Sequence, residues 1–160
     1  MQEQAGEGIS MAGFVTATQV SINIEAGSRE EALAFLAKRG VELGFADDAD
    51  AVEKAFLARE AEAETGLVDG FAVPHAKSDA IKQAGIAFVK LTHKVEWPSF
   101  DQQPVDCLLA LYVPAGEAGT THLKLLSQSA VMLMKEDFRA KLRESDDPEE
   151  IAALIDAGLE

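Results

Sequence analysis

The 160-residue sequence has only one cysteine, Cys107, so no disulfide can form within the chain. A chain without disulfides suits a reducing compartment, and we expect the protein in the cytoplasm. No apolar run approaches the roughly 20 residues that a membrane span requires. The first ten residues, MQEQAGEGIS, have neither the basic nor the apolar block of a secretory signal. The sequence therefore predicts a protein without direct membrane insertion.

Positive charge is also scarce: 14 Lys and Arg residues stand against 28 Asp and Glu, for a net charge of −14. This charge repels polyanions, and no basic cluster overrides it, so we expect no nucleic-acid partner. A basic protein partner would be attracted. Acidity that only keeps the protein soluble is the alternative explanation.

Nucleotide and metal motifs are missing as well. Neither GxxxxGK[ST] nor GxGxxG occurs, and the three histidines, His75, His93 and His122, are too far apart for a local metal motif such as HExxH. A zinc site needs three or four converging ligands. Cys107 lies in an apolar run and is interpreted as a buried hydrophobic residue, with a Cys–His nucleophile pair as the alternative. We therefore predict no metal and no cofactor.

A chain of 160 residues has the length of one domain. Residues 1–12 are polar and contain glycine, which predicts a flexible tail before a single domain of residues 13–160. A partly alternating, β-branched segment from Val15 to Ile24 predicts the first strand.

Capping signals then predict two helices. Ser28 and Glu31 form a capping box for the first helix, in which each side chain satisfies a backbone N–H of the other residue. Gly40 and Gly44 help to end that helix. The pair Asp47-Asp48 begins the second helix.

Three short apolar runs, Phe71–Val73, Ile86–Thr92 and Val105–Val113, have strand length. The last, VDCLLALYV, is apolar on both faces, which is typical of a central covered strand. Three further helices are predicted towards the end of the chain. Their signals are a Thr120-Thr121 cap with an apolar face of Leu123, Leu126, Ala130 and Met134, a segment around Phe138–Leu142, and an Asp147-Pro148 start. Helices and strands that alternate in this way predict a three-layer α/β domain.

The stretch TGLVDGFAVPHAKSDA places His75 directly after Pro74, at the end of the Phe71–Val73 strand. Proline fixes its own φ and keeps Val73 extended, so the histidine is held still near the surface. One ring nitrogen can then act as a nucleophile while a backbone carbonyl accepts from the other. A solvent-facing or capping histidine is the alternative.

Two more side chains suit an anion such as a phosphoryl group. His122 opens a helix, where backbone N–H groups and the helix dipole favour an anion and a neutral N–H donor. Arg59, near the end of the second helix, can hold phosphoryl oxygens in a fork. A polar first-turn residue and a solvated helix-end arginine are the respective alternatives. His93, in LTHKVEW, is interpreted as a surface residue.

The order of these elements resembles the enzyme IIA domains of the bacterial phosphoenolpyruvate:sugar phosphotransferase system, of the fructose–mannitol type. The resemblance rests on AREAEAETGLVDGFAVPHAKS, with its Arg59-Glu60, Thr65-Gly66 and Ala72-Val73-Pro74-His75 elements, and on FDQQPVDCLLALYVP and THLKLLSQSAVMLM. It covers about residues 15–158. The loop GLVDGFAV departs from the family, which often has a second glycine and an isoleucine before the Pro-His pair.

The resemblance implies a mixed, mostly buried sheet of about five strands flanked by helices on both faces. It also implies a phosphotransferase in which His75 accepts a phosphoryl group from phospho-HPr and passes it to a cysteine of a IIB component for coupled sugar uptake. His122 and Arg59 would line the site. We expect the IIB component on a separate chain, because no such domain is evident here. Phosphoryl transfer needs mainly positioning and charge stabilisation, which these side chains can supply.

Two alternatives remain open: a nitrogen-related regulatory IIA protein, and a non-catalytic binding module. Trp97, in VEWPSFDQQPVD, resembles the fructose group. The presence of His75, His122 and Arg59 together argues against a binding module that has lost activity.

Overall fold

The computed structural model describes residues 13–116 and 120–159, and within this part the side chains of residues 120–123 are not described. The predicted tail, residues 1–12, lies outside the described residues, so the 13–160 domain boundary stays a prediction. The described helices are η1 (Ala17–Gln19), α1 (Arg29–Glu42), α2 (Ala49–Glu62), α3 (Thr120–Leu133), α4 (Glu136–Glu144) and α5 (Pro148–Gly158). The strands are β1 (Val20–Ile24), β2 (Phe71–Ala72), β3 (His75–Ser78), β4 (Gly85–Val95) and β5 (Val105–Pro114).

The strands form one five-stranded sheet in the order β1-β4-β5-β2, with β3 also paired to β5. β4 and β5 are antiparallel, whereas β1 pairs with β4, and β2 and β3 pair with β5, in parallel. The sheet is therefore mixed, as the family resemblance implied. β5 lies at its centre and is buried along nearly its whole length, which confirms the prediction from VDCLLALYV.

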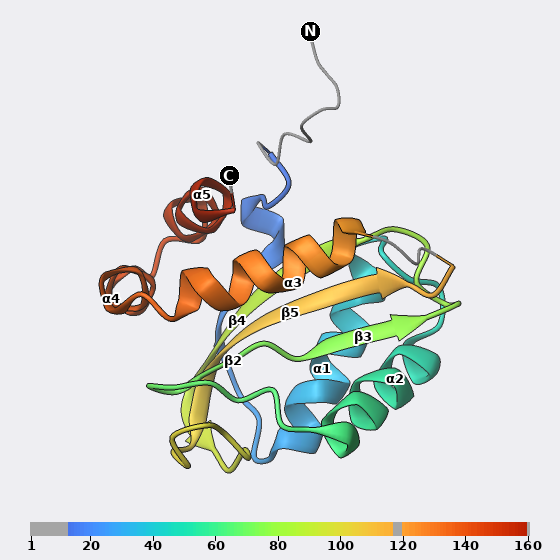
Figure 1. Cartoon of the computed structure of the whole chain (residues 1–160), viewed down its shortest axis with the longest axis horizontal. Coiled ribbons are helices and arrows are strands. Elements are labelled where there is room, and N and C mark those ends of the chain that lie inside the picture. The colour runs from blue at the N-terminus through green and yellow to red at the C-terminus, as the bar shows by residue number, and fades with distance from the viewer. Residues whose placement is uncertain (1–12, 117–119, 160) are drawn as a thin grey trace, which may run out of the picture.

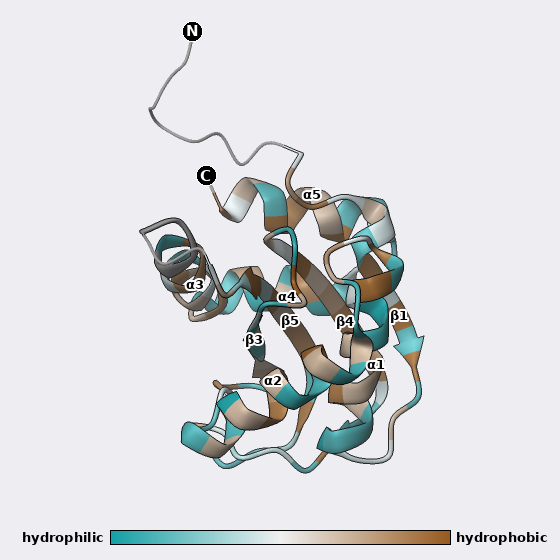
Figure 2. Cartoon of the chain, turned by 90° about the vertical axis from the view of Figure 1, so that its right-hand side faces the viewer, coloured by the Kyte–Doolittle hydropathy of each residue, from teal (hydrophilic) through white to brown (hydrophobic). Residues whose placement is uncertain are grey.

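Helices cover both faces of the sheet (Figure 1). Alternate residues of β5 enter different cores: Leu108 and Tyr112 pack with residues of α1 and α2, whereas Leu109 and Leu111 pack with residues of α3 to α5. This alternation follows from the two-residue period of a strand. Figure 2 colours much of β4 and β5 as hydrophobic, as expected for strands that are largely buried. The predicted three-layer α/β architecture is confirmed.

The predicted helix starts are also present. The carboxylate of Asp48 accepts from the backbone N–H of Ala51 (3.2 Å) at the start of α2, and Asp147 caps α5, which begins at Pro148. The reciprocal half of the first capping box is wrong. Ser28 Oγ accepts from Glu31 N (3.1 Å), but the Glu31 carboxylate accepts from Gly27 N (2.8 Å) and not from Ser28.

Three other expectations need correction. The first strand is shorter than predicted, because Ala17–Gln19 forms a 3₁₀ turn before it. Gly40 lies inside α1 instead of ending it. Glycine is needed at this position because a Cβ would stand 2.6 Å from a ring carbon of Tyr112. Gly44, with φ +83°, does follow the helix end.

The buried face of α3 also differs from the predicted one. Its buried apolar residues include Leu125 and Leu133, whereas Met134, directly after the helix, is 52% exposed. Helical periodicity alone did not select the face that packs.

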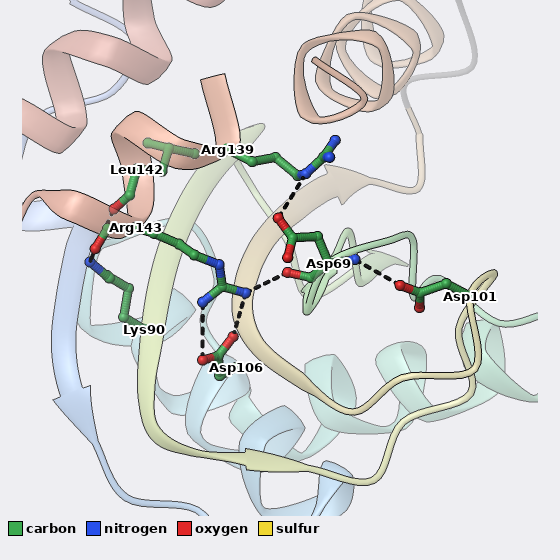
Figure 3. A network of polar contacts seen from close by, with 7 residues as sticks. All are labelled: Asp69, Lys90, Asp101, Asp106, Arg139, Leu142 and Arg143. Carbon is green, nitrogen blue, oxygen red and sulfur yellow. Dashed lines mark hydrogen bonds and ion pairs between the residues drawn. The ribbon is translucent and has the colours of Figure 1, made fainter. Parts of the chain in front are cut away.

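Helix α4 is fastened to the sheet by a polar network (Figure 3). Both terminal nitrogens of Arg143 donate to Asp106 on β5 (3.2 and 3.0 Å), and one of them also donates to the carbonyl of Asp69. Arg139, one turn earlier, pairs with the Asp69 carboxylate (3.2 Å). The Lys90 ammonium of β4 donates to carbonyls at the end of α4, including that of Leu142. None of the described helices is both long and apolar enough to cross a bilayer.

Candidate active site

His75 lies at the start of a strand and not at the end of one, which corrects the sequence interpretation. Pro74 interrupts the ladder between β2 and β3, yet both strands pair with β5 in one continuous register: Phe71 with Cys107 and His75 with Leu111. The Pro74 carbonyl still accepts from Leu111 N (3.0 Å). The proline therefore removes one donor without shifting the chain, and His75 is held at the sheet edge by β5.

The edge strand β3 lies between α2 and α3, which cover opposite faces of the sheet (Figure 1). Ala76 is fully buried in the core formed with α1 and α2. Because successive side chains of a strand alternate, His75 and Lys77 point to the other face. Leu126 of α3 lies on that face, and Arg59 reaches the same place from the last turn of α2.

The structure brings two of the three predicted site residues into direct contact. Arg59 Nε donates to His75 Nε2 (2.8 Å), and a terminal nitrogen of Arg59 donates to the carbonyl of Ala63 (2.7 Å). A guanidinium can only donate, so His75 Nε2 must be the accepting nitrogen. The proton is thereby assigned to Nδ1, which lies 3.2 Å from the carbonyl of Val73 and donates to it. The contacts thus define both the tautomer and the ring orientation.

Glu60 and Thr65 connect the end of α2 to the histidine strand. Glu60 is only 7% exposed and accepts from both the backbone N–H and the hydroxyl of Thr65. The carbonyl of Thr65 in turn accepts from Val73 N (3.0 Å), two residues before His75. The motif residues Arg59-Glu60 and Thr65-Gly66 therefore have different tasks: Arg59 contacts the histidine, and the others position its strand.

Gly66 has no room for a side chain. A Cβ there would stand 2.5 Å from the carbonyl of Pro98, and the Gly66 carbonyl accepts from Phe100 N (3.1 Å). Close approach of two backbones is one of the situations that require glycine. The Thr65-Gly66 turn is thereby packed against the loop that precedes β5.

The His75–Arg59 pair lies in an open cleft of about 450 Å³. Its lining combines apolar groups with charged ones: Ala55, Ala58, Arg59, Glu62, His75, Lys77, Val113 and Leu126. Sequence reasoning missed Lys77 and Glu62. The two-residue period of HAKS and the three-residue spacing from Arg59 to Glu62 are signals that could have found them.

The other candidate residues of the sequence lie on α3, β4 and β5. His122 lies within α3, one helical turn before the cleft residue Leu126, but its side chain is outside the described residues. His93 is exposed on β4, as predicted. Cys107 is 1% exposed, and burial raises the pKa of its thiol to about 12, so it is a buried hydrophobic residue. A larger opening of about 630 Å³ beside Arg29 and Trp97 contains none of the predicted site residues.

Nε2 of His75 accepts a hydrogen bond from an arginine in an open cleft, and this arrangement suits a protein that carries an anionic group. Residues 13–158 match the family model described as the phosphoenolpyruvate-dependent sugar phosphotransferase system, EIIA 2. The chain belongs to this EIIA family, which supports a role in phosphotransfer.

Relatives in this family differ in length. A fructose-specific EIIA component of the phosphotransferase system from Haloferax volcanii is 36% identical over 136 residues, which are 85% of this chain and 88% of the relative. A 2-O-alpha-mannosyl-D-glycerate-specific EIIABC component from Escherichia coli is 33% identical over 84% of this chain, but the match spans only 21% of that longer protein.

Solved structures share the fold. The nitrogen regulatory protein IIA-Ntr from Neisseria meningitidis superimposes with a TM-score of 0.82 and 27% identity, over 89% of this chain and 96% of that one. Enzyme IIAMTL of Escherichia coli, solved in complex with phosphorylated enzyme IIBMTL, gives a TM-score of 0.74 at 18% identity, over 89% and 97% of the two chains. Sugar-specific and nitrogen regulatory proteins thus both stand among the similar proteins.

Proposed function

We propose that this protein is a phosphocarrier that accepts a phosphoryl group on Nε2 of His75 and passes it to a second protein. The observation that carries the proposal is the contact between Arg59 Nε and His75 Nε2, because it leaves Nε2 unprotonated beside a cation in an open cleft. An unprotonated imidazole nitrogen is a competent nucleophile, and a fixed cation stabilises the charge that arrives with the phosphoryl group.

The transfer step balances without a cofactor. The Nε2 lone pair of His75 forms the new N–P bond, while the P–N bond to the donor histidine breaks and its electron pair returns to the donor nitrogen. The His75 ring gains positive charge, which the Val73 carbonyl stabilises by accepting from Nδ1–H. No proton has to leave the ring during the step. In the onward transfer a cysteine thiolate attacks phosphorus and the electron pair of the N–P bond returns to Nε2.

Arg59 changes partner as the group arrives. Its Nε–H, which donates to Nε2 in the unphosphorylated state, becomes available to a phosphoryl oxygen once Nε2 is bonded to phosphorus. The hydrogen bond to the Ala63 carbonyl holds the guanidinium at the end of α2 throughout. The loose transition state of phosphoryl transfer is stabilised mainly by such positioned charges. His122 is a further proposed donor; its support is the family resemblance and its place in α3, one turn before Leu126.

The proposed partners are phospho-HPr as donor and the cysteine of a IIB component as acceptor, in the cytoplasm and in the service of sugar uptake. The similarity to a IIA protein solved with its phosphorylated IIB partner supports the acceptor, and the fructose-specific relative supports the sugar role. A nitrogen-related regulatory role is the second candidate, supported by the similarity to IIA-Ntr. Both roles use the same phosphohistidine.

Intact mass spectrometry tests the proposal. Wild type, His75→Ala and His93→Ala are incubated with phosphoenolpyruvate, enzyme I and HPr. We expect one acid-labile phosphoryl adduct on wild type and on His93→Ala, and none on His75→Ala. An adduct that survives in His75→Ala, or none on wild type with several HPr homologues, would reject the phosphocarrier role of His75. Transfer from the labelled protein to a IIB component then separates the sugar role from the regulatory one.

A further inference from the structure

We propose that Lys77 is a second cationic ligand of the phosphoryl group and that it gives the cleft its net positive charge. This inference rests on the proposed phosphorylation of His75. Lys77 belongs to none of the motif elements that define the site, and it comes from the strand that carries the histidine.

The register of β3 places Lys77 beside His75. The two residues pair with Leu111 and Val113 on β5, and Ala76 between them is buried on the opposite face of the sheet. Two residues along a strand are about 6.6 Å apart, a gap that the flexible four-carbon stem of a lysine can span. Both side chains line the same cleft. The ammonium can therefore reach a group that is bonded to Nε2.

Within the part of the chain that the structure describes, Lys77 has no ion pair and no hydrogen bond from its side chain. Lys82 and Lys90, by contrast, each pair with an aspartate. Arg59 is already engaged with His75 and Ala63. Of the two cationic side chains in the described lining of the cleft, Lys77 is therefore the one that can bind a new anion without losing an existing contact.

The charge balance of the cleft depends on this lysine. Arg59 contributes one positive charge, and the exposed carboxylate of Glu62 in the same lining offsets it. A phosphoryl group brings a charge of roughly −1.5 to −2 at pH 7. Among the described lining residues the charges sum to zero without Lys77 and to +1 with it. Lys77 and Glu62 should therefore act on the phosphoryl group in opposite directions.

The test uses phosphoramidate, a small phosphoryl donor, so that partner docking does not enter the result. Wild type, Lys77→Met, Lys77→Arg, Glu62→Gln and Lys94→Met are labelled, and the phosphohistidine is followed by ³¹P NMR as a function of pH. Lys94 is an exposed lysine of β4 and serves as the matched control for loss of one positive charge. Circular dichroism and the amide NMR spectrum check that each variant is folded.

We expect Lys77→Met to slow labelling of His75 roughly 3- to 10-fold, the size of one typical net hydrogen bond in an open, solvent-exposed cleft. It should also raise the pKa of the phosphohistidine, because a nearby cation favours its deprotonated, more negative form. Glu62→Gln should lower that pKa, Lys77→Arg should restore it, and Lys94→Met should leave it unchanged. A merely structural role for Lys77 would not move the pKa of the phosphohistidine.

Two results would overturn the inference, and they are distinguishable. If wild type is labelled at His75 but Lys77→Met shows the wild-type rate and the wild-type phosphohistidine pKa, Lys77 is not a ligand, and the phosphocarrier proposal stands. If wild type is labelled neither by phosphoramidate nor by phospho-HPr, the phosphocarrier proposal fails and this inference fails with it.

Discussion

Arg59 Nε donates to His75 Nε2 across 2.8 Å, and this contact joins the last turn of α2 to the first residue of β3. It places a permanent cation against the nitrogen that we propose as the nucleophile. It also excludes a proton from that nitrogen, since the guanidinium has no acceptor. The same hydrogen bond therefore orients the ring and selects the tautomer.

Replacing Arg59 by Met should slow phosphorylation of His75 about 100-fold, which is the usual size of losing one preorganised charge donor. The Nδ1–H tautomer should also lose its dominance, because Nε2 is no longer restricted to accepting. Phosphorylation by phospho-HPr measures the first effect, and ¹⁵N NMR of the imidazole nitrogens measures the second. Arg59→Lys keeps the charge without the fork and should be intermediate. Wild-type rate and tautomer in Arg59→Met would contradict the assigned role.

Replacing Thr65 by Val should lower the free energy of unfolding by about 1–3 kcal/mol. The substitution keeps the shape but removes the hydroxyl donor from the buried Glu60 carboxylate, and a buried acceptor without its partner is costly. Urea unfolding measures the change. Thr92→Val, at an exposed position on β4, is the control and should stay close to wild type. Equal stability of the two variants would show that the Glu60–Thr65 link is not stabilising.

Replacing Gly40 by Ala should destabilise the protein even though Ala is the better helix former. The gain in helix propensity is about 0.5–1 kcal/mol, whereas forcing an extra carbon into a tight core costs about 1–3 kcal/mol. The ring of Tyr112 has little freedom to move away, because its hydroxyl donates to the Leu36 carbonyl (2.7 Å). Thermal unfolding should show a lower midpoint for Gly40→Ala.

The matched control for that substitution is Gly27→Ala, where an added Cβ meets only ordinary contact distances, 3.5 Å or more, to Glu31. Its unfolding midpoint should remain near that of wild type. A midpoint for Gly40→Ala at or above the wild-type value would mean that the Tyr112 ring yields to the added carbon.

Cys107 should make the protein lose stability at alkaline pH. Burial is the main reason that the pKa of its thiol is raised from about 9 to about 12, and the nearby Asp106 carboxylate adds to the rise. Between these values the unfolded chain releases the proton while the folded chain keeps it, so stability falls as pH rises. Cys107→Ala removes this loss. Unfolding free energies measured from pH 8 to 11 should therefore fall more steeply for wild type.

The same burial predicts that Cys107 of the folded protein does not react with thiol reagents at pH 8, because the thiolate is the reactive species. Labelling should appear only in denaturant. Parallel stability curves for wild type and Cys107→Ala, or rapid labelling of the native protein, would contradict the raised pKa.

Local signals predicted the elements well where the physical cause is itself local. Asp48 and Asp147 cap helices because a side-chain oxygen meets backbone N–H groups two or three residues ahead. The all-apolar run of β5 required two covering layers. The prediction that His75 ends a strand was wrong for a different reason. Pro74 does interrupt the series of backbone donors, but pairing with β5 resumes after it. That pairing depends on residues far along the sequence. The prediction that Gly40 ends its helix was wrong for the same reason, because Tyr112, which requires glycine there, lies on β5.

The sequence by itself determined the layer architecture, the helix starts and the residue types at the site, because hydrophobic period, capping chemistry and proline geometry act over a few neighbouring residues. Only the tertiary structure decided what these residues do together. Packing of α2 and α3 around the β3 edge brings Arg59 to His75, links Glu60 to Thr65 and adds Lys77 and Glu62 to the cleft. Such contacts depend on sheet register and helix docking, and these are set by the whole core.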